Sequence, residues 1–252
     1  MVATQAFIQS ISTTQLAGFN TAQLAGFSGT ELGYLTATQI GALSSGQLSG
    51  LATEQLRGLS ATNFAGLSSG QVSGLTATQF AGLTTSQISV LPSNIISSLS
   101  SVQLAGLTSS QLKVLTSTQL NALDTGNVTC LTATQLGYLT ATQLGSLGTT
   151  VFSALTSTQL SGFSSTQIRA LGTTALAVLD SGQLTGFSSS QIGALTATQL
   201  NAVSAGVIQS MSTSQLSGIS SATLRVLTTT TFGALSSAQL SGLTTSQIKA
   251  IG

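Results

Sequence analysis

The sequence contains few of the residues that carry out chemistry. Among 252 residues only nine are charged, and histidine and tryptophan are absent. The acids are Glu31, Glu54, Asp124 and Asp180, and the one thiol is Cys130. Acid–base pairs, metal clusters and nucleophilic triads need several carboxylates, imidazoles or thiolates close together. The sequence therefore predicts no enzyme, with no cofactor, no metal and no small-molecule substrate.

Charge and hydropathy exclude two further classes. A formal net charge of +1 cannot neutralise a run of phosphates, and Tyr34 and Tyr138 form no stacking platform, so we expect no nucleic-acid partner. Apolar residues make up 41% of the chain, but Ser, Thr or Gln interrupts every apolar run well short of the roughly 20 residues that cross a bilayer. We expect no transmembrane segment. Residues 1–5, MVATQ, lack a basic segment before an apolar core, so no N-terminal signal peptide is visible.

An eight-residue repeat occupies almost the whole chain. From Ser12 the sequence divides without insertion or deletion into thirty octads ending at Ile251, and Thr4–Ile11 is one degenerate octad before them. Positions 5 and 8 are apolar in all thirty, position 1 is Ser, Thr, Asp or Asn in twenty-six, and position 4 is Gln in twenty-one. The predicted organisation is a degenerate N-terminal repeat, residues 1–11, and a single repeat domain, residues 12–251.

The period favours one short helix per octad. In a continuous helix the apolar stripe would drift by about 80° per octad, and in a strand positions 5 and 8 would face opposite sides. In a short helix, Ser or Thr at position 1 and Gln at position 4 form a capping box. The apolar residues at position 8 of one octad and position 5 of the next have the spacing of a hydrophobic staple, as for Leu139 and Leu144. Small residues at positions 6 and 7 end the helix and allow close packing, and Gly at 7 is expected in the left-handed conformation.

The rare charges agree with this phase. All four acids lie in positions 1 to 4, and all five bases lie at position 6. A helix dipole that starts at position 1 favours this distribution. Four of the bases recur at a constant interval of seven octads and are predicted to form a periodic set of surface charges: Arg57, Lys113, Arg169 and Arg225.

A longer period is superposed on the octad. Octads that lack Gln at position 4 recur, with one exception, every three or four octads, on average 3.5 octads or 28 residues. We therefore predict an all-α solenoid with about 3.5 short helices per superhelical turn, although duplication of seven-octad blocks explains the spacing equally well. Where Gln is replaced by Ile95, Val151 or Val207, the side chain is expected at an altered internal corner or in an interface stripe against another protomer.

Two single residues carry local expectations. Pro92 stands at position 1 of its octad, where proline is tolerated at the start of a helix. Cys130 stands at the small position 7 and is expected to be a buried small side chain.

A β-solenoid remains the alternative fold. Thr-x-Thr triplets such as Thr76-Ala-Thr78 resemble the threonine arrays with which flat β-solenoids bind ice. Ice binding is therefore an alternative function, conditional on the β fold. An adhesive spacer that binds a surface or glycan through Ser and Thr is another.

The octads as a whole resemble the octapeptide arrays of very large bacterial secreted or surface proteins, often described as adhesin-like. The resemblance rests on Thr-x-x-Gln-Leu-x-x-Leu, as in Thr116-Ser-Thr-Gln-Leu-Asn-Ala-Leu123. It implies an extracellular or cell-surface location and a role as spacer, stalk or self-assembling filament subunit. Low charge and similar repeats lead us to expect self-association, end to end or lateral.

Overall fold

The computed structural model describes residues 3–251, in which short α-helices follow one another without any β-strand. The chain divides into two compact units, residues 1–122 and 123–252. Each unit is an all-α solenoid with one helix per octad, which confirms the predicted fold class. The alternative β-solenoid is wrong, and with it the premise of ice binding through a flat threonine face.

The helices are four to seven residues long. In the first unit they are α1 Gln5–Ser10, α2 Thr13–Gly18, α3 Thr21–Ala25, α4 Gly29–Gly33, α5 Ala37–Gly41, α6 Ser45–Ser49, α7 Thr53–Gly58, α8 Ala61–Ala65, α9 Ser69–Ser73, α10 Ala77–Gly82, α11 Thr85–Ser89, α12 Ser93–Ser97, α13 Ser101–Ala105, α14 Ser109–Val114 and α15 Ser117–Asn121. In the second unit they are α16 Thr125–Cys130, α17 Ala133–Gly137, α18 Ala141–Gly145, α19 Thr149–Ser153, α20 Ser157–Ser161, α21 Ser165–Ala170, α22 Thr173–Leu176, α23 Ser181–Leu184, α24 Ser189–Ala194, α25 Ala197–Ala202, α26 Ala205–Ser210, α27 Thr213–Ser217, α28 Ser221–Arg225, α29 Thr229–Gly233, α30 Ser237–Ser241 and α31 Thr245–Ile251.

Each helix begins where the octad predicts. In α18, the Thr140 hydroxyl accepts a hydrogen bond from the Gln143 amide at 3.2 Å, and the Gln143 Oε1 accepts from the Thr140 amide at 2.8 Å. Thr140 itself is extended, with φ −74° and ψ 160°. The degenerate octad starts in a related way, because the Thr4 hydroxyl accepts from the Phe7 amide. The capping-box prediction is confirmed.

The helix ends differ from the prediction. No residue in the described part of the chain has a positive φ, so the left-handed conformation expected for Gly at position 7 is wrong. Instead, the chain leaves each helix through right-handed or extended residues, and the position-8 amide donates to the position-5 carbonyl, as from Leu147 to Leu144 at 3.3 Å. Glycine is therefore needed at position 7 for a different reason.

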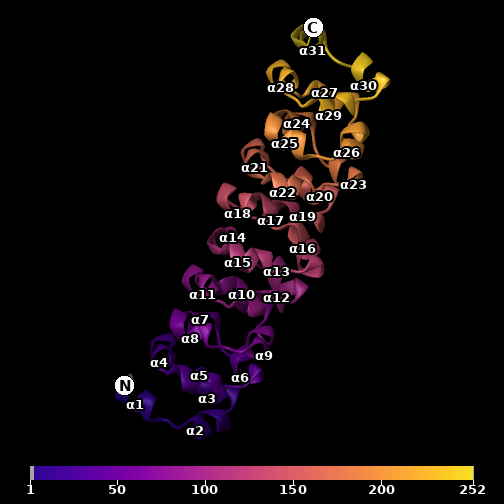
Figure 1. Ribbon diagram of the computed structural model, residues 1–252. Coiled ribbons are helices and arrows are strands. Elements are labelled where there is room, and N and C mark those ends of the chain that lie inside the picture. The colour runs from indigo at the N-terminus through magenta and orange to yellow at the C-terminus, as the bar shows by residue number, and fades with distance from the viewer. Residues whose placement is uncertain (1–2, 252) are drawn as a thin grey trace. The chain divides into compact units, whose positions relative to one another are not determined.

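That reason is the close packing of helices three places apart. In both units nearly every helix lies against the third helix along, as α4 does on α7 and α24 on α27 (Figure 1). Position 7 of the later octad meets position 2 of the octad three places before it. A Cβ at Gly186 would collide with the backbone of Ser157, and a Cβ at Gly218 with that of Ser189. The expectation that small residues permit close approach is confirmed.

The core is made of positions 5 and 8. Their side chains are almost fully buried through most of both units, as for Leu48 and Phe64, and the exceptions lie near the two ends of the array. A helix of one or two turns is unstable alone in water, so this shared burial holds the helices in place. Pro92 lies at the N-cap of α12 with φ −59°, as expected.

Matched glycine substitutions test the packing. Gly186→Ala should lower the free energy of unfolding by about 1 kcal/mol or more, because the added methyl overlaps the Ser157 backbone. Gly206→Ala is the control, since a Cβ there meets nothing within 4 Å. Because alanine favours the helix, Gly206→Ala should raise stability by up to about 1 kcal/mol. Urea denaturation followed by circular dichroism measures both. Equal effects would show that position 7 is not a packing site.

Candidate functional site

The most distinctive feature of the interior is a row of glutamines, all of them buried except the half-buried Gln215. In each of its members the position-4 amide reaches backbone carbonyls one superhelical turn earlier, and we call this set the glutamine row. Its members include Gln39, Gln47, Gln55, Gln71, Gln79, Gln87, Gln103, Gln111 and Gln119 in the first unit and Gln159, Gln167, Gln183, Gln191, Gln199, Gln215, Gln239 and Gln247 in the second.

One glutamine side chain performs two tasks. The Gln87 Oε1 accepts from the Thr84 amide at 2.9 Å, which completes the capping box of α11. Its Nε2 donates to the carbonyls of Leu56 at 2.7 Å and Leu59 at 2.9 Å. These acceptors lie 31 and 28 residues earlier. Gln87 is only 1% exposed, so both ends of the amide are satisfied inside the protein.

The spacing of these bonds agrees with the predicted superhelix. Within each unit the strongest helix packing joins octads three apart, and the glutamine bonds join octads four apart. A turn of about 3.5 octads lies between these two values. The 28-residue period of the sequence is therefore the separation between a glutamine and the position-8 carbonyl that it binds.

The bond meets a need of the backbone. A position-8 carbonyl lies between two helices, where its own helix offers no further amide. A buried carbonyl without a donor costs roughly 1–3 kcal/mol. Gln55 supplies the donor for Phe27 at 2.6 Å, and Gln79 does so for Leu51 at 2.6 Å. In the described residues, every buried side-chain polar atom has a hydrogen-bond partner.

Two polar substitutions at position 4, Asn63 and Glu31, keep part of this function. Asn63 is one methylene shorter, and its Nδ2 still donates to the Leu35 carbonyl, 28 residues back. Glu31 has no donor, and its Oε1 instead accepts from the Ala3 amide at 2.6 Å, again 28 residues back. Its Oε2 accepts from the Ser28 amide at 2.8 Å. The hydrogen bonds from Ser28 and Ala3 hold the pKa of the Glu31 carboxyl below its ordinary value.

Three of the four apolar substitutions at position 4 accompany the loss of the cap at position 1, and the fourth, Val207, keeps the Ser204 cap. Pro92 has no N–H for a glutamine oxygen to accept, and the residue three places on is Ile95. Gly148 and Gly172 stand at the N-caps of α19 and α22 and have no side chain that could cap the helix. The position-4 residues of these two octads are likewise apolar, Val151 and Ala175. The capping box is thus lost as a unit in these octads.

The candidate interface stripe is buried within the chain itself. Ile95, Val151 and Val207 are 1%, 5% and 6% exposed. Their burial favours the internal corner over contact with another protomer. The sequence pattern identified an apolar environment at these positions but did not distinguish which surface provides it.

The predicted surface charges are all exposed near helix ends. Arg57, Lys113, Arg169 and Arg225 lie in the last turns of α7, α14, α21 and α28. Arg57 Nη1 lies 3.2 Å from Glu54 Oε1, in a solvent-exposed pair. Such a pair contributes little to stability, about 0–1 kcal/mol.

Cys130 is half-buried and its Sγ donates to the Gly126 carbonyl at 3.1 Å, so the expectation that it is buried is wrong.

Among residues 3–251, no three His, Cys, Asp or Glu side chains gather as metal ligands. No helix in this range has the length and apolar character to span a bilayer.

The comparisons with known proteins concern the repeat. Residues 8–45 and 163–197 match the ALTTAQ repeat model. These ALTTAQ repeat segments comprise 38 and 35 of the 252 residues, one in each unit, and both consist of the octads described above. A comparison with curated proteins finds no match. The chain is therefore a repeat array, and its helical repeats agree with the octad phase deduced from the sequence.

Sequence reasoning found one half of the glutamine's role and missed the other. The capping box follows from residues three apart, whereas the second bond joins a glutamine to carbonyls in the octad four places before it. The recurrence of glutamine at position 4 was the signal that could have predicted this second bond. Serine or aspartate also suits the first turn of a helix, but only glutamine combines an acceptor with a long-reaching donor.

A glutamine-to-glutamate pair tests the row. Gln87→Glu keeps the capping oxygen but turns a carboxylate toward the Leu56 and Leu59 carbonyls, so the free energy of unfolding should fall by at least about 2 kcal/mol. Gln15→Glu is the control, because Gln15 is exposed and caps only its own helix. It should change stability by less than about 0.5 kcal/mol. Urea midpoints compare the two, and equal midpoints would contradict the role of the row.

Glu31 predicts a local dependence on acid. Its lowered pKa in the folded state means that its contribution is complete above the ordinary pKa of glutamate and is lost as pH falls through the folded value. A carboxyl titration by NMR should give a midpoint below that of free glutamate. Exchange of the Ala3 amide, corrected for intrinsic rate, should accelerate over the same pH range. In Glu31→Gln this acceleration should disappear, and its persistence would assign it to another group.

Proposed function

We propose that this chain is a non-catalytic structural scaffold that acts outside the cell or at its surface, as a spacer, stalk or filament subunit. The observation that supports it most directly is the glutamine row. The recurrent polar side chains of the interior are used in hydrogen bonds between successive turns. A reactive or ligand-binding site would instead leave polar groups converging on a shared space.

The modular construction supports the same proposal. Each octad supplies two apolar side chains at positions 5 and 8, and most octads also supply their own cap and one bond to the preceding turn. Length is therefore set by the number of octads, as in other repeat proteins whose units stack on their neighbours. The few charges are dispersed along the chain rather than gathered in a site, and all except the buried Glu31 are exposed.

The location is proposed from the resemblance to octapeptide arrays of secreted and surface proteins. The hydroxyl-rich exterior and the scarcity of charge are compatible with that setting. The glycan-adhesive alternative rests only on exposed Ser and Thr, so the spacer is preferred.

A tagged chain and a shortened chain test this proposal in the cells that produce the protein. Removal of residues 60–115 deletes seven whole octads and joins Leu59 to Thr116 in phase. Both chains should be labelled by antibody on intact cells and should keep the same helicity per residue, since a spacer tolerates a change of length that preserves its phase.

Removal of residues 60–111 is the matched control. It deletes half an octad less, joins Leu59 to Leu112 and breaks the octad phase. This variant should lose helicity and surface signal. Labelling of the full chain only after permeabilisation would contradict the extracellular location, and equal behaviour of the two deletions would contradict the modular scaffold.

A further inference from the structure

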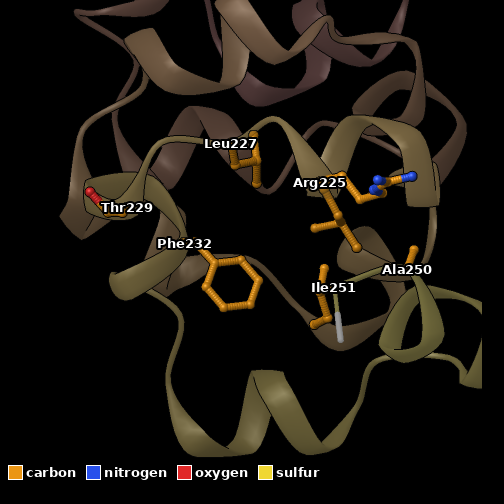
Figure 2. A pocket seen from close by; sticks show the side chains of 7 residues that line it. Arg225, Leu227, Thr229, Phe232, Ala250 and Ile251 are labelled. Carbon is orange, nitrogen blue, oxygen red and sulfur yellow. The ribbon is translucent and has the colours of Figure 1, made fainter.

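Two arginines of the second unit lie on the same side of the solenoid. Arg169 and Arg225 are exposed at position 6 of α21 and α28, seven octads or two superhelical turns apart. One groove reaches both helices, because Arg169 and Val226 both line it. The Arg225 guanidinium points away from the apolar Leu227 and Phe232 side chains (Figure 2). We call this side, formed by α21 and α28, the basic edge.

Two aspartates lie on a different side of the same unit. Asp124 and Asp180 are exposed at the N-caps of α16 and α23, and they are also seven octads apart. α16 packs on α19, and Gln183 of α23 donates to the Phe152 and Leu155 carbonyls in the octad of α19. In Figure 1 this stack follows the right side of the second unit, whereas α21 and α28 follow the left side. We call the stack of α16, α19 and α23 the acidic edge.

The sequence intervals agree with this placement. Asp180 follows Arg169 by 11 residues, about two fifths of a 28-residue turn, so the two charges are roughly 140° apart around the axis. Successive turns are separated by a helix packing distance, so the two like charges of one edge are about 20 Å apart. This exceeds the Debye length of about 8 Å at physiological ionic strength. Repulsion within an edge is therefore weak.

The four charges are available to a partner. Within residues 123–251, no ion pair involves Arg169, Arg225, Asp124 or Asp180. The Oδ1 atoms of the two aspartates accept the capping amides of their own helices at 2.8 and 2.6 Å. A carboxylate has about four acceptor sites, so each aspartate can also accept from a guanidinium without giving up its cap.

An exposed valine stands beside one charge on each edge. Val226 follows Arg225 and is 63% exposed, and Val178 lies two residues before Asp180 and is 37% exposed. If the edges meet, these valines bring apolar surface next to an ion pair. The attraction between the charges is then stronger than in open water, because less water surrounds them.

We propose that the basic edge of one copy docks side by side against the acidic edge of a second copy. Arg169 and Arg225 of one copy pair with the two aspartates of the other, and both pairs form at once because the two intervals are equal. The inference rests on the proposed scaffold function and identifies its partner as a second copy of this chain.

The difference between the edges determines the kind of assembly. Each docked copy still has one edge of each sign available between its two faces, so the contact is heterologous and adds further copies sideways. An acidic polymer would use the basic edge alone. A second copy uses both edges and their equal intervals, and is therefore the preferred partner.

Sedimentation velocity over a concentration series at low salt tests this contact. Arg169→Gln with Arg225→Gln removes the charges of the basic edge and should weaken association by about 10-fold or more. Asp124→Asn with Asp180→Asn should do the same, and asparagine keeps the helix caps. Circular dichroism verifies that each variant is folded.

The matched control is Ser161→Glu with Ser217→Glu. These serines are exposed at position 6 of α20 and α27, also seven octads apart, on helices that belong to neither edge. The control lowers the net charge by as much as the arginine variant does. It should associate as the unchanged chain does, so a loss equal to that of the arginine variant would assign the effect to net charge and overturn the contact.

A mixing experiment tests the pairing of unlike edges. The arginine variant keeps the acidic edge, and the aspartate variant keeps the basic edge. Mixed together, the two should form dimers and no longer species, although neither associates alone. High salt should dissociate these dimers and also the assemblies of the unchanged chain, because it screens exposed charges.

The outcomes separate this inference from the proposed function. A folded chain that stays monomeric at every concentration, or arginine and aspartate variants that associate as tightly as the unchanged chain, overturns the lateral contact. Retention of a monomeric chain on a sulfated polysaccharide, lost in the arginine variant, would overturn it in favour of an acidic polymer. None of these results affects the antibody and deletion tests of the scaffold. A chain that fails those tests while its edges still associate would contradict the proposed function alone.

Discussion

The hydrogen bonds of the position-4 glutamine amide connect one turn of the solenoid to the next, and the other features of the octad depend on them. Leucines at positions 5 and 8 exclude water from the interior, but burial alone is non-directional and would tolerate sliding of one turn over another. The carbonyls that follow each helix are buried by the same packing and need a donor. Because Gln111 and Gln191 each bind carbonyls 28 and 31 residues back, the turns are held in one register.

This constraint explains why substitutions at position 4 are not isolated. Asn63 and Glu31 retain a bond to the residue 28 places back, although the glutamate reverses its direction by accepting from an amide. Where Pro92 removes the N-cap amide, glutamine is replaced by the buried Ile95. Asn63 and Glu31 thus keep a bond between turns, whereas the octad of Pro92 replaces the capping box with apolar contact.

The fold class and the placement of most residues could be predicted because the octad encodes them locally. Capping residues, the staple between positions 8 and 5, and the distribution of acids and bases all involve residues within one or two octads. Of the two reasons expected for Gly at position 7, the left-handed helix end is wrong. The close packing of small residues is confirmed, and it involves a backbone three octads earlier, as between Gly218 and Ser189. Cys130 shares that position but remains half-buried, because position 7 lies at the margin of the helix contact rather than in the core.

The sequence by itself determined the phase of the helices, the two core positions of each octad and the 28-residue period, because capping chemistry and apolar spacing act over a few residues. Only the tertiary structure decided what the period connects and which glycines must lack a side chain. Those properties arise when octads three and four apart become neighbours, and the linear order does not show which of their atoms meet.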